Sequence, residues 1–177
     1  WGSGRLGNVG THFIDAARML SGREVLAVSA TLDLSGRPDC RGPEFRDPGG
    51  WGMLRMEGGL MAVLDAADYG AGPVQLVLNG TRGRAITGMD VVEVETWDGK
   101  RETRPGARME ATSMDRAVDE IVSWMDGGGQ SPFSPSPAEG MKTLEVIVAC
   151  HVSHGRNAGW TELPLTGPDR EREVNAG

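Results

Sequence analysis

The stretch EVLAVSATLDL, residues Glu24–Leu34, decides the fold that this sequence predicts. Its residues fall into two alternating series, one beginning with Val25 and Ala27 and the other with Leu26 and Val28. A period of two over this length is typical of a β-strand. Apolar residues occur in both series, so we expect both faces of the strand to be covered. A sheet-to-sheet contact between two copies of the chain would cover the second face.

The segments that follow this strand predict further strands, most of them antiparallel. Residues 35–50 combine glycine, proline and charge and are expected to form a loop. The runs WGMLRM and LMAVLDAAD flank Glu57–Gly59, and a short glycine-containing link between two apolar runs indicates a hairpin. Four later runs also read as strands: VQLVLNG, GRAITGM, VVEVETWDGK and GWTELPL.

Helical spacing precedes the first strand. Residues 8–20 predict a helix that stops at Ser21 and Gly22, with Asn8 and Thr11 as candidate N-caps. Residues at i, i+3, i+4 and i+7 form its expected apolar stripe: Phe13, Ala16, Ala17 and Leu20. The adjacent stripe is more polar and contains Asn8, His12, Asp15 and Met19. These polar residues should therefore lie at the flank of a packed face.

Two more helices close the chain. One is expected to begin at Ser113 and to end at residues 127–129, with the inner stripe Ala117, Ile121, Trp124 and Met125. The other spans residues 136–157 and has Pro137 in its first turn. Grouped strands with helices at the ends predict the α+β class, an open, mostly antiparallel sheet of about six strands with helices packed on one face.

The composition and net charge of the chain argue against some classes of partner. The chain has 177 residues, of which 38% are hydrophobic and 24% charged, with a formal net charge of -7. These values are ordinary for a globular domain, and the acidic balance argues against nucleic acid or an anionic membrane surface as partner. Cys40 and Cys150 fit neither a zinc site nor a disulfide framework, and Cys150 follows an apolar run as a core thiol would. A reducing, cytoplasmic location is the expectation.

Three histidines are the candidates for chemistry. His12 follows Gly7 and Gly10, which leave room for a ligand or another backbone, although a lone histidine at a helix flank can equally be structural. Asp15 stands three residues on and could orient the imidazole ring. His151 and His154 lie near a helix end without a third ligand nearby, so we expect no metal there.

The ordered series of motifs resembles the C-terminal domain of the Gfo/Idh/MocA oxidoreductases. NVGTHFID, residues 8–15, corresponds to the family pattern Asp-x-Gly-x-His-x-x-Asp. The hairpin MLRMEGGLM, the turn LNGTRGR, the closing helix and the strand WTELPL follow in the family's order. The resemblance covers about residues 4–165. It implies a domain over residues 1–165 and a polar tail over residues 166–177, which is expected to fray.

The resemblance also implies the reaction. Members of the family use NAD or NADP, held by an N-terminal Rossmann domain, to oxidise or reduce sugars, polyols and related compounds. On this basis His12 is the catalytic candidate, and Asn8 and Asp15 are the substrate-binding candidates. No glycine-rich fingerprint precedes residue 7, so we expect the Rossmann domain to be absent from this chain and the isolated chain to be inactive. A homodimer or homotetramer through the sheet is the expected assembly.

One departure from the pattern leaves other functions open. Asn8 stands where the family most often has aspartate, and an amide can hydrogen-bond a hydroxyl but cannot accept its proton. A non-catalytic binding or assembly module with the same fold is therefore one alternative. A relative that uses NAD in glycoside cleavage is another.

Overall fold

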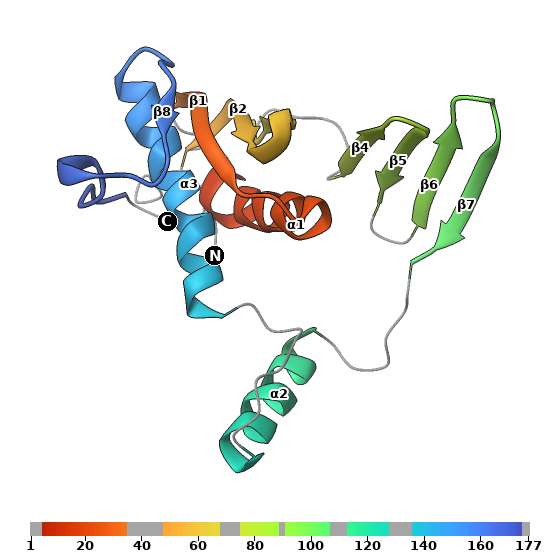
Figure 1. The fold of residues 1–177 in the computed structure, drawn as a ribbon. Helices are drawn as coiled ribbons and strands as arrows, with labels where there is room; N and C mark the ends of the chain where they lie inside the picture. The colour runs from red at the N-terminus through yellow and green to blue at the C-terminus, as the bar shows by residue number, and fades with distance from the viewer. Residues whose placement is uncertain are drawn as a thin grey trace. The chain divides into compact units, whose positions relative to one another are not determined.

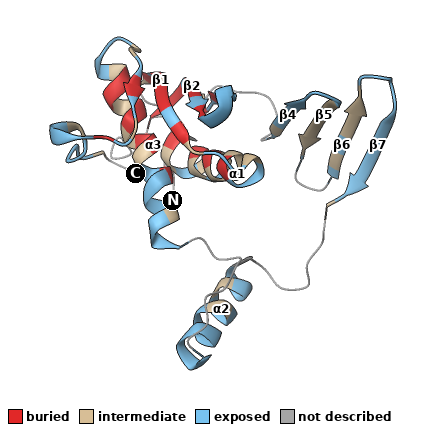
Figure 2. Cartoon of the chain, in the orientation of Figure 1, coloured by how far each residue is buried: buried red, intermediate tan, exposed pale blue. Residues whose placement is uncertain are grey.

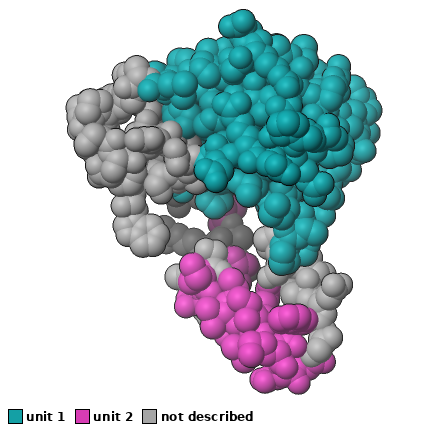
Figure 3. All heavy atoms as spheres, turned by 90° about the vertical axis from the view of Figure 1, so that its left-hand side faces the viewer, with its two compact units in different colours: residues 1–70, 135–177 teal, residues 71–134 magenta. Residues whose placement is uncertain are grey.

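The computed structural model describes residues 5–34, 48–67, 75–88, 91–106, 113–127 and 136–174. The chain divides into two compact units, which are coloured separately in Figure 3. Unit 1 comprises residues 1–70 and 135–177, and unit 2 comprises residues 71–134.

Helices and strands follow in the order shown in Figure 1. The helical elements are η1 (Arg5–Gly10), α1 (Thr11–Ser21), η2 (Glu57–Gly59), α2 (Ser113–Gly127), α3 (Pro137–Gly155) and η3 (Gly167–Asp169). The strands of unit 1 are β1 (Val25–Asp33), β2 (Gly49–Met56), β3 (Met61–Asp65) and β8 (Thr161–Glu162). The strands of unit 2 are β4 (Leu76–Gly80), β5 (Gly83–Thr87), β6 (Val91–Thr96) and β7 (Arg101–Pro105).

Strand β1 is the centre of unit 1. Its sheet has the order β3-β2-β1-β8, and every neighbouring pair is antiparallel. The predicted hairpin between β2 and β3 is confirmed, and Gly58 adopts φ 67° in the link, a conformation that glycine takes without steric cost. The long strand predicted over residues 24–34 is confirmed as β1.

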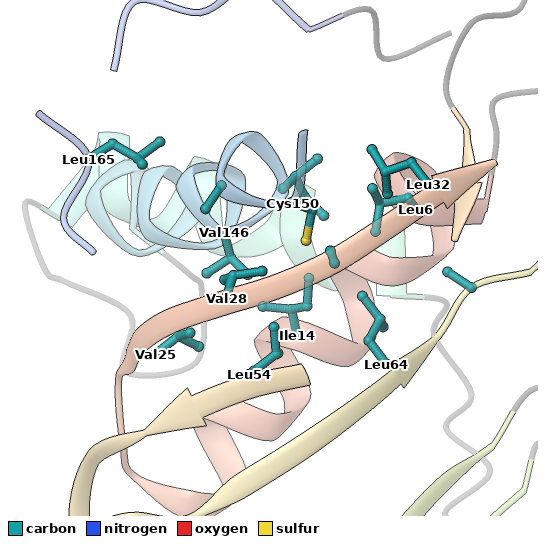
Figure 4. Packing of buried hydrophobic residues seen from close by; sticks show 14 of the residues in the cluster. Leu6, Ile14, Val25, Val28, Leu32, Leu54, Leu64, Val146, Cys150 and Leu165 are labelled. Atoms are coloured by element: carbon teal, nitrogen blue, oxygen red, sulfur yellow. The ribbon is translucent and has the colours of Figure 1, made fainter. Parts of the chain in front are cut away.

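Helices α1 and α3 cover one face of this sheet (Figure 4). Ile14 of α1 and Val146 of α3 belong to the same buried cluster as Val28 of β1 and Leu54 of β2. Burial of these side chains removes apolar surface from water, which stabilises the fold by about 25 cal/mol for each Å² buried. Pro137 occupies the first turn of α3, as predicted, and the Ser136 hydroxyl caps that helix by accepting a hydrogen bond from the Glu139 N–H.

The stripe predicted for the first helix is wrong by one position. The buried residues of η1 and α1 repeat every four positions: Leu6, Gly10, Ile14 and Arg18. Leu20, expected in the core, has 53% of its surface exposed. The spacing of apolar residues does not identify the buried stripe here, because two of its members, Gly10 and Arg18, are not apolar side chains.

The opposite face of the unit 1 sheet carries exposed apolar side chains. Trp51, Met53 and Val63 lie on it, and Met53 stands directly opposite Val63 in the β2–β3 pair. Figure 2 shows the contrast between the buried centre of unit 1 and its exposed periphery. Across β1, Arg55 and Glu162 form an ion pair at 2.6 Å, and both residues are partners of the fully buried Ala27 in the strand register.

Unit 2 contains a second four-stranded sheet with the order β4-β5-β6-β7. The three predicted strands of the meander are confirmed, and β7 is an additional strand. Its sequence, RETRP, lacks an apolar alternation because all five residues are exposed at a sheet edge. A turn through Gly99, at φ 88°, brings β7 back against β6.

Helix α2 is confirmed, but its expected inner stripe is not buried. Ile121, Trp124 and Met125 are all exposed, and the helix is largely pale blue in Figure 2. The prediction was wrong because amphipathic spacing shows which residues share one side of a helix, and burial requires a partner surface. Within unit 2, the described residues do not bury this stripe.

The α+β class and the antiparallel pairing are confirmed. The expected single sheet of about six strands instead consists, within the described residues, of two four-stranded sheets, one in each unit. The tail also differs from expectation, because η3 is folded and Asp169 pairs with Arg156 at the end of α3, 2.6 Å between Nη2 and Oδ2. No helix in the described part of the chain is long and apolar enough to cross a bilayer.

Candidate functional site

The candidate site lies where η1 runs into α1. Leu6 is buried, and its N–H donates to the carbonyl of Pro48 at 3.2 Å, which fixes the start of the segment. Gly10 is the N-cap of α1 and makes no side-chain capping bond. The prediction that Asn8 or Thr11 caps this helix is therefore wrong. The Thr11 hydroxyl instead donates to the carbonyl of Asn8 at 2.9 Å, within the wide π-helical turn of η1.

His12 and Asn8 are both exposed in these first turns. No residue in the described part of the chain hydrogen-bonds the His12 ring. An imidazole at this position can accept or donate a proton to a molecule from outside, and an amide such as that of Asn8 can both donate and accept hydrogen bonds. The roles assigned to both residues from the sequence stay predictions.

Asp15 points to a different set of neighbours. Its Oδ1 accepts a hydrogen bond from the Thr143 hydroxyl at 3.3 Å and lies 3.5 Å from Nη1 of Arg18. Among the described residues, Oδ2 has no such partner, and 45% of the side chain is exposed. Asp15 therefore joins the exposed start of α1 to the buried contact between α1 and α3.

Arg18 is the centre of that contact and was not predicted from the sequence. Only 6% of its side chain is exposed, and its five N–H groups match five hydrogen bonds. Nε and Nη2 bind the Glu24 carboxylate at 2.8 and 3.2 Å, and Nη2 also reaches Glu139 Oε2 at 2.5 Å. Nη1 donates to the Glu139 carbonyl at 3.2 Å and to Thr143 Oγ1 at 2.9 Å.

Lys142 completes this cluster from α3. Its Nζ lies 2.8 Å from Glu24 Oε1 and 2.9 Å from Glu139 Oε1. Hydrogen bonding to Arg18 holds the pKa of Glu24 at about 2, against its usual 4.5. Lys142, followed by Arg18, lowers the pKa of Glu139. Both carboxylates are therefore ionised at neutral pH, which a buried guanidinium requires of its partners.

A four-residue spacing is the signal that could have identified Arg18. It stands four positions after Ile14, in the series that also contains Leu6 and Gly10. An arginine in a buried series implies paired charges elsewhere in the chain, since an unpaired buried charge is very costly. Glu139, its partner, is 121 positions away, so the pairing itself cannot be read from the sequence.

The other singled-out residues have structural positions. Cys150 is confirmed as a core thiol, and burial raises its pKa to about 12. Cys40 lies outside the described residues. The Leu32 N–H donates to Nδ1 of His154 at 3.1 Å, so this ring nitrogen is unprotonated in that contact. Burial, with the nearby positive charge of Arg172, lowers the pKa of His151 to about 4.

Residues 1–86 match the family described as GFO/IDH/MocA C-terminal domain. No curated protein matches the sequence. The solved structures that are similar include oxidoreductases from three bacteria.

Aldose-aldose oxidoreductase from Caulobacter crescentus, solved with glycerol, is 23% identical, with a TM-score of 0.72 over 91% of this chain and 48% of its own. An oxidoreductase domain protein from Kribbella flavida is 19% identical, with a TM-score of 0.68 over 92% and 52% of the two chains. An oxidoreductase from Agrobacterium radiobacter, solved with NAD+, L-tartaric acid and magnesium, is 19% identical, with a TM-score of 0.63 over 89% and 48%.

The chain corresponds to a part of each of these structures. The chain spans about half the length of each matched structure. At these identities the structures show the shared fold, and the family match is carried by the first half of the sequence. Residues 1–86 are therefore similar to the GFO/IDH/MocA C-terminal domain family, and the fold of the chain is similar to that of these oxidoreductases over about nine-tenths of its length.

Proposed function

We propose that this chain is the substrate-binding half of an NAD(P)-dependent oxidoreductase that acts on a sugar, a polyol or a related hydroxyl or carbonyl compound. The observation that carries the proposal is the exposure of His12 and Asn8 at the glycine-containing start of α1, inside the segment that matches the family. Relatives solved with glycerol, and with NAD+ and L-tartaric acid, support the compound class.

His12 is the proposed acid-base group. Oxidation of a carbinol requires that its hydroxyl proton leaves as the hydride leaves carbon, so a base must touch that oxygen. The His12 imidazole can accept this proton, and the Asn8 amide can hold the hydroxyl through hydrogen bonds. Asp15 Oδ2 is available for a second substrate hydroxyl, in keeping with its predicted role.

The cofactor belongs to another part of the protein. Dinucleotides bind at the carboxyl ends of parallel strands. All strand pairs in the described residues are antiparallel, which supports a cofactor held by a separate domain. Nicotinamide, when bound by a separate domain, supplies the hydride acceptor or donor. This chain's residues then contribute only substrate binding and the movement of the hydroxyl proton.

The test uses the protein in which this chain is joined to a nicotinamide-binding domain. Glucose, myo-inositol, glycerol and L-tartrate are offered with NAD+ and with NADP+, and reduced cofactor is measured by absorbance. We expect turnover of at least one compound and a loss of roughly 100-fold or more in His12→Ala. Met19→Ala, a change at an exposed residue of the same helix, is the matched control and keeps full activity. No turnover of any compound overturns the proposed reaction class.

Asn8 favours a second candidate function. An amide in place of a carboxylate suits a module that binds a polyol without reacting with it. Full turnover in His12→Ala would show that His12 takes no part in the reaction and would select this module. Polyol binding without turnover in the joined protein would select it as well. Product analysis separates both from the third alternative, because glycoside cleavage releases a free sugar with no net change in the cofactor.

Self-association and location complete the proposal. The exposed face with Trp51, Met53 and Val63 suits a sheet-to-sheet contact in a homodimer or homotetramer, because burial would remove this apolar surface from water. Val63 is 81% exposed, so Val63→Glu should leave the fold intact and reduce the mass in light scattering. A monomeric parent chain contradicts the assembly. A cytoplasmic location stays a prediction.

A further inference from the structure

We propose that Arg18 is the positioning residue for His12, holding α1 at a fixed setting against α3 so that the imidazole is presented in one place. This inference rests on the proposed role of His12. The two residues are six positions apart on one helix, about 9 Å along its axis. Any shift of α1 at Arg18 is therefore carried to His12 by a rigid element.

The contacts of Arg18 fix α1 in more than one direction. Glu139 and Thr143 hold the guanidinium to the first turns of α3, and Glu24 holds it to the segment that leads into β1. Asp15, one turn closer to His12, shares both Arg18 and Thr143. The cluster therefore connects three segments of the chain at the end of α1 that lies farther from His12.

The geometry of the cluster requires arginine. A planar guanidinium can satisfy five acceptors at once, whereas a lysine ammonium has three donors and acts as a point charge. Removal of the positive charge leaves the carboxylates of Asp15, Glu24 and Glu139 with Lys142 as the cation that contacts two of them. Repulsion between these carboxylates would then push α1 and α3 apart.

The first test reads the position of His12 without using activity. The chain has three histidines, so its imidazole ring signals in two-dimensional NMR are few, and His12→Gln identifies one of them. In Arg18→Met we expect the His12 signal to move or split while those of His151 and His154, in the last turns of α3, stay in place. Glu139→Gln keeps Arg18 paired with Glu24 and should give a smaller displacement of the same signal.

The control is a more exposed arginine that pairs with a carboxylate elsewhere in the chain. Arg84 pairs with Glu95 at 2.7 Å in unit 2, and Arg84→Met should leave the His12 signal unmoved. A purely stabilising role of Arg18 would lower the unfolding temperature of its variants and leave the His12 signal of the folded chain unchanged. If Arg18→Met does not fold, Glu139→Gln and Arg18→Lys decide the question. An unmoved His12 signal in the folded variants overturns the inference.

The second test uses the joined protein and a compound that it turns over. Arg18→Lys should lower kcat by roughly 10-fold to 100-fold, because small misplacements of a catalytic group are costly, and should change KM much less. An unchanged kcat in Arg18→Lys and Glu139→Gln, with His12→Ala inactive, rejects the positioning role alone. An active His12→Ala rejects the proposed function instead, whatever the NMR spectra show.

Discussion

The backbone N–H of Ala30 donates a 2.8 Å hydrogen bond to the hydroxyl of Ser153, which joins the centre of β1 to the last turn of α3. Strand β8 pairs with β1 at Ala27 and Val28. Backbone N–H groups farther along the same edge of β1, such as that of Ala30, therefore need other acceptors. Ser153 supplies one of them, and in turn donates to the carbonyl of Gly159 at 2.7 Å. A hydroxyl from helix α3 thus accepts the hydrogen bond that a backbone carbonyl of a longer neighbouring strand would accept.

Ser153→Ala should destabilise the chain by about 1–3 kcal/mol, because it leaves the buried Ala30 N–H without its acceptor. Urea unfolding monitored by circular dichroism measures the change. Ser123→Ala, at an exposed position of α2, is the control and should stay within about 0.5 kcal/mol of the parent. Equal effects of the two changes would contradict the role of Ser153.

The lowered pKa of His151 predicts a loss of folding stability in mild acid. Its pKa is about 4 in the folded chain, against 6.5 ordinarily, so between these values the unfolded chain binds a proton that the folded chain does not. Stability is therefore complete above pH 6.5 and falls as the pH drops toward 4, by about 1–2 kcal/mol after allowance for partial exposure. Urea unfolding of the parent and of His151→Gln across this window measures the slope, which should be shallower in the variant.

Glu24 predicts a further loss at lower pH. Its pKa is about 2, against 4.5 ordinarily, so its contribution is present above pH 4.5 and disappears as the pH falls toward 2. Because 41% of the side chain is exposed and screened by solvent, we expect Glu24→Gln to cost about 1–2 kcal/mol at neutral pH. Urea unfolding at neutral pH and near pH 3 measures both effects. A constant difference between parent and variant at the two pH values would contradict the assignment.

Cys150 should be unreactive in the folded chain. Its thiol is buried and its pKa is about 12, so almost no thiolate is present at about pH 8. In a Cys40→Ser background we expect Ellman's reagent to modify Cys150 only after urea is added. Rapid stoichiometric modification of the native protein would show that the α3 core opens.

Much of unit 1 could be predicted because its local signals agree with its tertiary structure. The alternation through Val28 matches a strand, Gly58 matches a hairpin link, and Pro137 matches a helix start. The candidate site is a mixed case. The position of His12 on a helix start follows from its own neighbours, whereas the engagement of Asp15 with Thr143 depends on α3, 128 positions away.

The sequence by itself determined the order and type of most elements, since the period of apolar residues and the turn residues act over a few positions. Only the tertiary structure decided which side of α1 is buried and that Arg18 lies there. A guanidinium can be buried only where acceptors surround it, and Glu24, Glu139 and Thr143 come together only when the chain folds. For the same reason, the apolar stripe of α2 was readable in the sequence, while its exposure was not.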